Sequence, residues 1–416
     1  MKILFINISD IIGGAAITAK RLGDRLEKNY NFENYFIVRT KVSKSKNIFP
    51  SRRNSFIYFV ERWINILFNL AGLQYIYLPF SPREILRLTK KIKPDIISLH
   101  NILGGYFSTD LLIKLSQIAP IVWTLHDMWA ITANASHTLG DDSWKKMRSG
   151  KYEKKIFPQI GINTGNWLIK RKKKIYEKSN IMFVTPSNWL YNIVTASPLT
   201  IGKKIFCIHN GVDLEIFKPR NKTIIRNKIN IPTDAKVITF IAEKFKKNPF
   251  KGGGDLFKIL EILDKQLNKE IHLLIIGKNF LYKNYMYKNI ILHYFDYIKD
   301  EKKLSELLSA TDLYIYPTKA DTLPNVLIEA IACGTPCITF DIGGCEDIIK
   351  NDVSGYLIPQ SDLNLFCEKS IELLGDKEQL NILSHSCRQY AEKYFSIDLM
   401  ANRYFKIFEE LKNENG

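Results

Sequence analysis

The sequence predicts an α/β protein built from two doubly wound domains, and three observations predict it. The chain has 416 residues, which is more than a single hydrophobic core usually serves. Short apolar stretches typical of buried parallel strands alternate with helical stretches along both halves. Hydrophobic residues make up 46% of the chain, so wholesale disorder is excluded.

The expected strands fall into two series. In the first half they are Ile3–Ile8, Asn34–Arg39, Asp95–His100, Ile121–His126, Met182–Pro186 and Ile205–Ile208. In the second half they are Val237–Ala242, His272–Gly277, Ile290–Tyr294, Asp312–Tyr316 and Cys337–Phe340. A polar stretch at 218–222 separates the series, so we expect domains at residues 1–217 and 218–394. Ligands of such sheets bind where the strands end, which predicts a site at the carboxyl ends.

The most informative stretch runs from residue 317 to residue 347. Pro317 ends an apolar strand, and Asn325–Cys333 has the periodicity of a helix. Backbone N–H groups at such a helix start favour an anion such as phosphate. Asp321 lies just before the helix and Glu329 within it, so both carboxylates can accept hydrogen bonds from sugar hydroxyls. Alternatively, Asp321 is only a helix cap and Glu329 a solvated helix residue.

Two glycine turns follow these carboxylates and complete a recognisable pattern. Gly334 ends the helix, and Gly343-Gly344 opens a second tight loop. The stretch resembles the C-terminal signature of glycosyltransferase family 4, retaining enzymes whose GT-B fold has two Rossmann-like domains facing across a cleft. The family pattern is Glu, seven residues, Glu; here Asp321 replaces the first Glu and Glu329 is in place.

The resemblance extends over most of the chain through short motifs in the family's order. These are Gly13-Gly14, Ser98–Asn101, Thr124–Trp129, Pro186–Leu190, Asn210–Asp213 and Lys251-Gly252. The His-Asp-Met-Trp segment is similar to a bacterial branch that builds surface polysaccharide of the cell envelope, such as capsule or lipopolysaccharide. That branch often has cysteines next, where this chain has Ala133–His137. The resemblance also implies that the last helix, 395–416, crosses back onto the first domain.

Site residues in the first half follow strand ends. Gly13-Gly14 opens a helix, so its amides could meet the donor diphosphate; the alternative is a plain tight turn. His100 and His126 each end a strand, where a lone histidine is often structural. Because His100-Asn101 resembles the position of the family's histidine, we expect His100 to be catalytic and His126 to bind the donor.

Cations and amides of the second half are expected to hold the donor. The family supplies an Arg and a Lys against the diphosphate; Lys251 fits the Lys, and Lys247 is a candidate in a lysine-rich loop that leaves the Arg position open. Alternatively these lysines are solvated. The catalytic residues predicted here are therefore His100, Lys251 and Asp321. The remaining donor-binding candidates are Thr322, Leu323, Pro324, Asn325, Val326 and Glu329.

The motifs predict a reaction without metal or cofactor. The other common glycosyltransferase fold holds a divalent ion with Asp-x-Asp, and this chain has no such pair. In the resembled family the departing phosphate is thought to take the acceptor proton on the donor's own face, so no protein nucleophile is expected. The nucleotide-diphosphate sugar enters as a substrate.

Positive charge is concentrated in the first half. Residues 1–200 hold 30 lysines and arginines against 13 acidic residues, whereas residues 201–416 hold 30 against 29. Clusters occur at Arg52-Arg53, 83–93 and 170–174. No nucleic-acid motif accompanies the charge, so we expect no nucleic-acid partner. A solubilising face, or attraction to an anionic membrane surface or a pyrophosphate-linked acceptor, explains the excess.

An uncharged stretch of twenty residues, 63–82, is a poor membrane span because it contains asparagines and prolines. It fits an interfacial helix or a docking surface for a lipid-linked acceptor, or else packs inside the domain. The first apolar run is too short for a signal peptide. The six cysteines show no metal-site spacing and fit free thiols in a reducing compartment. We expect a cytoplasmic enzyme, peripheral at the inner face of the membrane.

Together these observations predict a hexosyltransferase that uses a nucleotide sugar and a glycan or lipid-linked acceptor. Two alternatives share the fold: a nucleotide-sugar epimerase, and a phosphorylase, for which no pyridoxal-lysine site is found. A catalytically inactive protein of GT-B shape that binds glycan or membrane is a third, favoured by Asp321 and the open Arg position.

Overall fold

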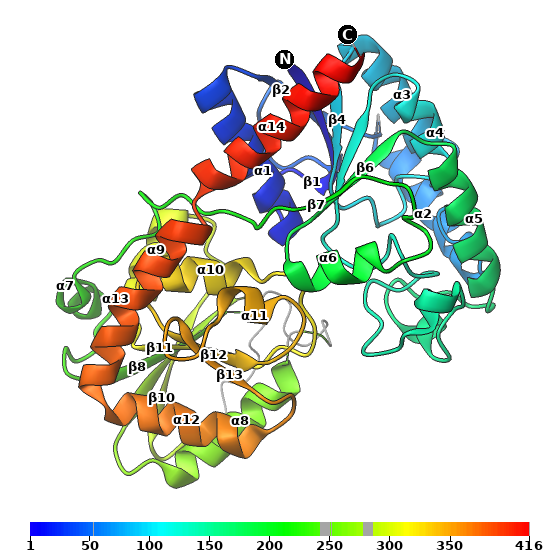
Figure 1. Ribbon diagram of the computed structural model, residues 1–416. Helices are drawn as coiled ribbons and strands as arrows, with labels where there is room; N and C mark the ends of the chain where they lie inside the picture. The colour runs from blue at the N-terminus through cyan, green and yellow to red at the C-terminus, as the bar shows by residue number, and fades with distance from the viewer. Residues whose placement is uncertain (53, 242–249, 251, 278–285, 416) are drawn as a thin grey trace. The chain divides into compact units, whose positions relative to one another are not determined.

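The computed structural model describes residues 1–52, 54–241, 250, 252–277 and 286–415 (Figure 1). The chain forms two compact units. The first contains Met1–His209 and Met400–Gly416, and the second contains Asn210–Leu399. Each unit holds one parallel sheet covered by helices on both faces, so the chain has the two-domain α/β fold that the sequence predicts.

The sheet of the first unit has the strand order β3-β2-β1-β4-β5-β6-β7. Its strands are β1 (Lys2–Ser9), β2 (Glu33–Thr40), β3 (Ile48–Pro50), β4 (Ile96–Leu99), β5 (Ile121–Thr124), β6 (Ile181–Thr185) and β7 (Ile205–Cys207). Its helices are α1 (Gly14–Tyr30), α2 (Ser55–Leu70), α3 (Ser81–Ile92), α4 (Leu111–Ser116), α5 (Gly165–Glu177) and α6 (Asn188–Thr195), with 3-10 turns at Ser143–Lys146 and Glu153–Lys155.

Alternate residues of β1 pack on opposite faces of this sheet. Leu4 and Ile6 share a buried cluster with residues of α3, α4 and α5, whereas Phe5 stacks on Phe36 beneath α1. Figure 1 shows α1 and the last helix, α14 (Ile397–Asn415), on one side of the strands and α3, α4 and α5 on the other. Successive side chains of a strand point to opposite faces of the sheet, so a strand covered on both faces buries all of them.

The sheet of the second unit has the strand order β10-β9-β8-β11-β12-β13. Its strands are β8 (Lys236–Ile241), β9 (Ile271–Ile276), β10 (Ile290–Phe295), β11 (Leu313–Tyr316), β12 (Cys337–Phe340) and β13 (Gly355–Ile358). Its helices are α7 (Lys222–Lys228), α8 (Gly253–Gln266), α9 (Glu301–Ala310), α10 (Asn325–Ala332), α11 (Cys345–Ile348), α12 (Leu363–Gly375) and α13 (Lys377–Tyr394). One core lies under α8 and α12, and another under α10 and α13.

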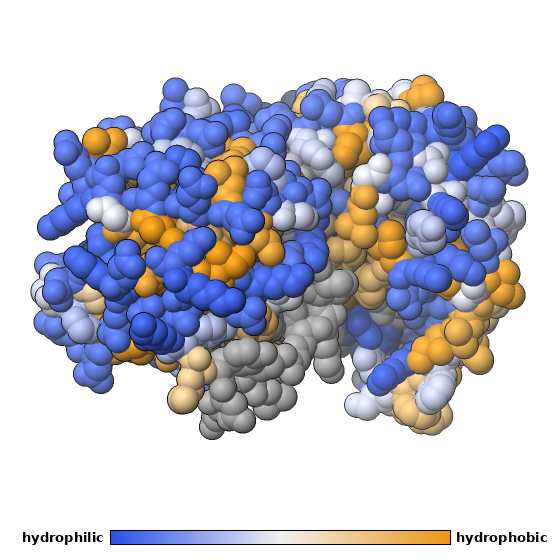
Figure 2. Space-filling view, turned by 90° about the horizontal axis from the view of Figure 1, so that it is seen from below, coloured by the Kyte–Doolittle hydropathy of each residue, from blue (hydrophilic) through white to orange (hydrophobic). Residues whose placement is uncertain are grey.

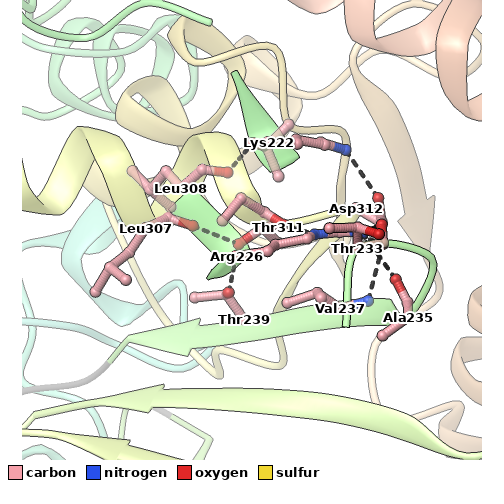
Figure 3. Close-up of polar contacts among 12 residues, drawn as sticks. Lys222, Arg226, Thr233, Ala235, Val237, Thr239, Leu307, Leu308, Thr311 and Asp312 are labelled. Atoms are coloured by element: carbon pink, nitrogen blue, oxygen red, sulfur yellow. Dashed lines mark hydrogen bonds and ion pairs between the residues drawn. The ribbon is translucent and has the colours of Figure 1, made fainter. Parts of the chain in front are cut away.

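A buried ion pair joins the amino ends of β8 and β11 (Figure 3). The Asp312 carboxylate accepts hydrogen bonds from Arg226 and Lys222, each at 2.8 Å, and from the Val237 backbone N–H at 2.8 Å. Arg226 also donates to the carbonyl oxygens of Thr233, Ala235 and Ala310. Burial raises the pKa of Asp312, but Lys222, Arg226 and the Val237 N–H outweigh it, so the pKa lies below its ordinary 3.8.

The boundary between the units lies between His209 and Asn210. The sequence places it eight residues later, after Phe217. Val212 explains the difference, because its N–H donates to the Phe395 carbonyl and its own carbonyl accepts from Ile397, each at 2.9 Å. These bonds tie the Asn210–Asp213 turn to the second unit.

The last helix packs on the first unit from Met400 onward. The Tyr404 hydroxyl lies 2.8 Å from the Thr124 hydroxyl at the end of β5, and Phe405 stacks on Tyr30 of α1. Lys204 bonds Glu410 at the C-terminal end of α14. Aromatic and polar contacts thus fix this helix along its length.

All eleven expected strands are confirmed within two residues of the predicted ends, and two further strands were missed. β3 has only three residues and ends in Pro50, and β13 begins with Gly355. Both lie at sheet edges, where short strands with Pro or Gly give a weak apolar pattern. None of the helices in the described part of the chain is long and apolar enough to cross a membrane.

Two predicted surface charges are buried instead. Arg52 donates to Glu61 at 2.8 Å, and Glu61 is fully buried. Lys172 is 3% exposed, although it belongs to the run 170–174. Glu61 compensates the charge of Arg52, and the Lys172 ammonium donates to the backbone carbonyls of Trp129 and Thr132. No disulfide joins the six cysteines, all of which lie among the described residues, as expected.

Candidate active site

Asp321 lies in the loop that joins the carboxyl end of β11 to α10. Its Oδ2 atom accepts a hydrogen bond of 2.7 Å from the Tyr316 hydroxyl at the end of β11. Burial raises the pKa of Tyr316 well above 10, so the phenol remains a hydrogen-bond donor. The N-cap of α10 is Pro324, and no side chain caps the helix. The interpretation of Asp321 as a helix cap is therefore wrong.

The Gly343-Gly344 turn holds the backbone of Asp321. The Asp321 carbonyl accepts the Gly344 N–H at 3.1 Å. Gly343 has a φ of +58°, and a Cβ at this position would collide with the same carbonyl oxygen. The turn needs glycine for its conformation and for the close approach. The two loops follow β11 and β12, which are neighbours in the sheet, so both lie at its carboxyl end.

A second glycine brings the start of α8 against the same loop. Gly252 has a φ of +66°, and a Cβ there would collide with the Pro317 carbonyl oxygen. The Phe250 carbonyl accepts the Lys319 N–H at 2.7 Å and the Thr318 hydroxyl at 2.9 Å. The candidate cations Lys247 and Lys251 lie outside the described residues. Phe250 and Gly252, which flank Lys251, contact the loop that carries Asp321.

Helix α10 carries the second carboxylate. Glu329 is only 5% exposed, so it is not the solvated helix residue of the alternative interpretation. Asn325 lies one turn before it on the same face of the helix, and Asn325 Oδ1 accepts a 2.8 Å bond from Asn210. Of the expected donor-binding residues, Thr322, Leu323 and Pro324 are buried, whereas Asn325 and Val326 are partly exposed. The predicted loop and helix start thus occupy one end of the sheet.

The first unit places its candidates at the carboxyl ends of β1, β4 and β5. Gly13 is the N-cap of α1 and has a φ of +90°, a conformation that favours glycine. No atom lies within 4 Å of a Cβ built on Gly13, and Gly14 begins the helix. The backbone there is open to an approaching group, as an anion-binding turn requires.

His100 and His126 form a pair. His100 Nδ1 lies 2.9 Å from His126 Nε2, and His100 Nε2 lies 3.3 Å from the Ser98 hydroxyl. Burial, and then the charge of His126, lower the pKa of His100 well below 6.5; burial lowers the pKa of His126 to about 4. Both imidazoles are therefore neutral at neutral pH. One of the two facing nitrogens carries a hydrogen and donates it to the other in a hydrogen bond.

The two histidines differ in exposure. His100 is 1% exposed and both of its ring nitrogens face protein groups, whereas His126 is partly exposed. His126 is therefore the more exposed member of the pair. That His100 is catalytic and His126 binds the donor remains a prediction, with His100 held against His126 and Ser98.

Sequence reasoning missed Asn7, which organises this end of the sheet. Its side chain donates to the Ala15 carbonyl at 3.2 Å and accepts the Asn101 N–H at 3.2 Å. It thereby connects the loop after β1 to the loop after β4. The available signal was a single amide within the apolar run of β1, and Asn7 is fully buried.

The segment after His126 is held by two buried charges that sequence reasoning also missed. Lys172 donates to the carbonyls of Trp129 and Thr132, and Glu153 accepts the N–H groups of Ala133 and Asn134. Burial lowers the pKa of Lys172 to about 7 and raises that of Asp127, which begins the segment, to about 6. Both charged side chains lie far along the chain from the segment they hold, so no local pattern marks them.

Both units thus collect glycine turns and polar side chains at the carboxyl ends of parallel strands. Two family models match the chain. Residues 12–216 match the model described as Glycosyltransferase Family 4, and residues 221–394 match the model described as Glycosyl transferases group 1. The chain belongs to glycosyltransferase family 4.

Individual relatives agree with this assignment. The N-acetyl-alpha-D-glucosaminyl L-malate synthase of Bacillus anthracis is 24% identical over 97% of this chain and 96% of its own length. The UDP-Gal:alpha-D-GlcNAc-diphosphoundecaprenol alpha-1,3-galactosyltransferase of Escherichia coli is 29% identical over 47% of this chain and 51% of its own. The structure of sucrose-phosphate synthase from Thermosynechococcus elongatus superposes with a TM-score of 0.71 at 16% identity, covering 99% and 98% of the two chains.

The protein is therefore an enzyme of the glycosyltransferase class with the GT-B fold. Across the described residues, no group of three or more His, Cys, Asp or Glu side chains could hold a metal ion.

Proposed function

We propose that this glycosyltransferase moves a hexosyl group from a nucleotide-diphosphate sugar to a growing polysaccharide or lipid-linked oligosaccharide, with retention of configuration and without a metal ion. The observation that carries the proposal is the pair of carboxylates Asp321, whose loop packs against Gly343 and Gly252, and Glu329, which is buried on α10. Carboxylates at a strand end and on a neighbouring helix suit a ligand with several hydroxyl groups.

The donor is proposed to lie along this end of the second unit. Glu329 accepts hydrogen bonds from the ribose hydroxyls, and Asp321 accepts them from the transferred sugar. The backbone N–H groups at the start of α10 meet the diphosphate. Lys251 and Lys247 are proposed from the motif alone to stabilise the negative charge that grows on the leaving diphosphate, an effect of about a few kcal/mol.

The chemical step needs no protein nucleophile. The bond from the anomeric carbon to the phosphate oxygen breaks, and the bond from that carbon to the acceptor oxygen forms on the same face of the sugar. The departing phosphate takes the acceptor's proton, so atoms and charge balance. His126 contributes hydrogen bonds as a neutral imidazole, because its pKa of about 4 keeps it uncharged at neutral pH.

The name of the Escherichia coli relative supports the acceptor class, since it specifies a UDP-galactose donor and a diphosphoundecaprenol-linked acceptor. A lipid-linked acceptor places the enzyme at a membrane, and the positive charge of residues 1–200 is consistent with an anionic lipid surface. We propose a peripheral position at the inner face of the cytoplasmic membrane.

A panel of nucleotide hexoses tests the proposal. With lipid-linked acceptors, we expect one class of α-linked donor to release free nucleotide and to give an α-linked product by NMR, with no change on adding EDTA. An inverted product would contradict retention. Activity lost in EDTA and restored by Mn²⁺ would contradict the metal-free step, and conversion of the donor into its epimer would identify the alternative chemistry.

A further inference from the structure

Helix α2 exposes an apolar face to solvent. Its five outward residues recur every three or four positions, so they form one stripe along the helix. They are Phe56, Phe59, Trp63, Leu67 and Leu70, with exposed fractions of 73%, 58%, 53%, 61% and 59%. Exposed apolar residues are usually scattered singly, so a stripe of this length marks an interaction surface.

Two polar side chains of the same helix, those of Tyr58 and Glu61, bond to other parts of the protein. Glu61 is fully buried and accepts hydrogen bonds from Arg52, Phe80 N–H and Ser81 N–H. The Tyr58 hydroxyl accepts a 2.9 Å bond from Arg39. A helix on the surface of a water-soluble domain normally has the opposite orientation, with its apolar side inward. The buried network fixes this orientation, so the apolar stripe is a stable feature of the fold.

The apolar surface continues onto a neighbouring segment. The Ile162 N–H donates to the Leu70 carbonyl at 3.0 Å, and the Ile162 side chain is 62% exposed. We call the five residues of the stripe and Ile162 the α2 surface. On the right of Figure 2, the side on which Figure 1 draws α2 and α5, orange side chains reach the surface beside blue ones.

The segment that carries Ile162 is strongly basic, and α2 itself exposes no acidic residue. Between Asn54 and Ser81 the ionisable acidic and basic residues are Glu61, which is buried, and Arg62, which is exposed. Residues 145–174, which carry Ile162, contain eleven lysines and arginines and one acidic residue, Glu153. Glu153 is buried, and of the eleven basic residues only Lys172 is buried.

We propose that the α2 surface inserts into the interface of an anionic lipid bilayer, with the basic residues of 145–174 against the lipid phosphates. Aromatic and aliphatic side chains on one helix face, bordered by lysine and arginine, are the chemistry of an interfacial helix. A second copy of the chain fits less well, because pairing two α2 surfaces would bring two basic borders together. This inference rests on the proposed function and names the surface that holds the enzyme at its acceptor.

Cosedimentation of the full-length protein with vesicles tests the inference. Trp63→Gln combined with Leu67→Gln should lower partitioning onto phosphatidylglycerol–phosphatidylcholine vesicles at least about tenfold, at 0.1 M and at 1 M salt. The matched control combines Ile224→Gln and Ile382→Gln, in α7 and α13, whose exposed fractions of 54% and 58% are similar. The control should bind as the wild type does.

A second variant separates charge from insertion. Lys170→Gln, Lys173→Gln and Lys174→Gln together, leaving the buried Lys172 intact, should weaken binding at 0.1 M salt and have little effect at 1 M, where the Debye length falls to ~3 Å. Wild-type vesicle binding by the Trp63 and Leu67 variant would overturn the inference. Equal binding of the wild type to vesicles of phosphatidylcholine alone would also overturn it. So would a wild-type protein that does not bind vesicles but forms a dimer in ultracentrifugation, if the Trp63 and Leu67 variant is a monomer. Release of free nucleotide in the absence of vesicles tests the proposed function separately.

Discussion

Asp312 and Asp321 stand at opposite ends of the same strand, β11, and have opposite surroundings. Asp312, at the amino end, is bound by Arg226, Lys222 and a backbone N–H of its own unit. Asp321, at the carboxyl end, is partly exposed and accepts a bond from the neutral phenol of Tyr316. The comparison indicates that the carboxylate at the amino end is compensated by cations of its own unit, whereas the carboxylate at the carboxyl end is partly exposed.

Arg226→Met should have the largest effect on this comparison. It removes the cation beside a mostly buried carboxylate and leaves three carbonyl oxygens without their donor, so we expect the free energy of unfolding to fall by ~3–5 kcal/mol. Chemical denaturation measures the change. Lys222→Met is the control, since Lys222 contacts the same carboxylate but is 41% exposed, and should cost at most ~1 kcal/mol.

The same pair predicts a pH dependence. The folded-state pKa of Asp312 is depressed, so its stabilising contribution is fully present above the ordinary pKa of 3.8 and is lost as the pH falls through the lower folded value. The stability difference between the wild type and Arg226→Met should therefore shrink in that acidic range. A difference that stays constant down to pH 2 would show that the arginine acts through packing alone.

Glu329→Gln probes the carboxyl end and should have the next largest effect. The change keeps the shape of the side chain but removes charge-assisted hydrogen bonds to the ribose, so nucleotide affinity should fall by ~1.5–3 kcal/mol, roughly tenfold to a hundredfold. Calorimetric titration with the nucleotide diphosphate measures it. Glu368→Gln, on the exposed face of α12, is the matched control and should bind normally. Unchanged affinity in Glu329→Gln would show that this carboxylate does not bind the ribose.

The sequence predicts the fold well because burial on both faces of a parallel sheet leaves continuous apolar runs. It also brings Asp321, Glu329 and the Gly343-Gly344 turn to one sheet end, since glycines and strand ends are local signals. The relative exposure of His100 and His126 depends on how two strand ends pack, which no local pattern records.

Long-range pairing accounts for the other differences. The sequence marks Arg52 and Lys172 as members of basic clusters, yet each is buried against groups brought near by the fold. Asn7 likewise accepts a hydrogen bond from Asn101, 94 residues away. Buried polar groups require partners, but the sequence does not say which partners the topology supplies.

Measuring both stability and turnover in Asp312→Asn and Asp321→Asn tests the central claim most directly. The account predicts that Asp321→Asn unfolds at the wild-type temperature and loses at least about tenfold in kcat/KM, the equivalent of one charge-assisted hydrogen bond. It predicts that Asp312→Asn is destabilised by ~3–5 kcal/mol but turns over normally per folded molecule. A stable, fully active Asp321→Asn, or a stable but inactive Asp312→Asn, would contradict it.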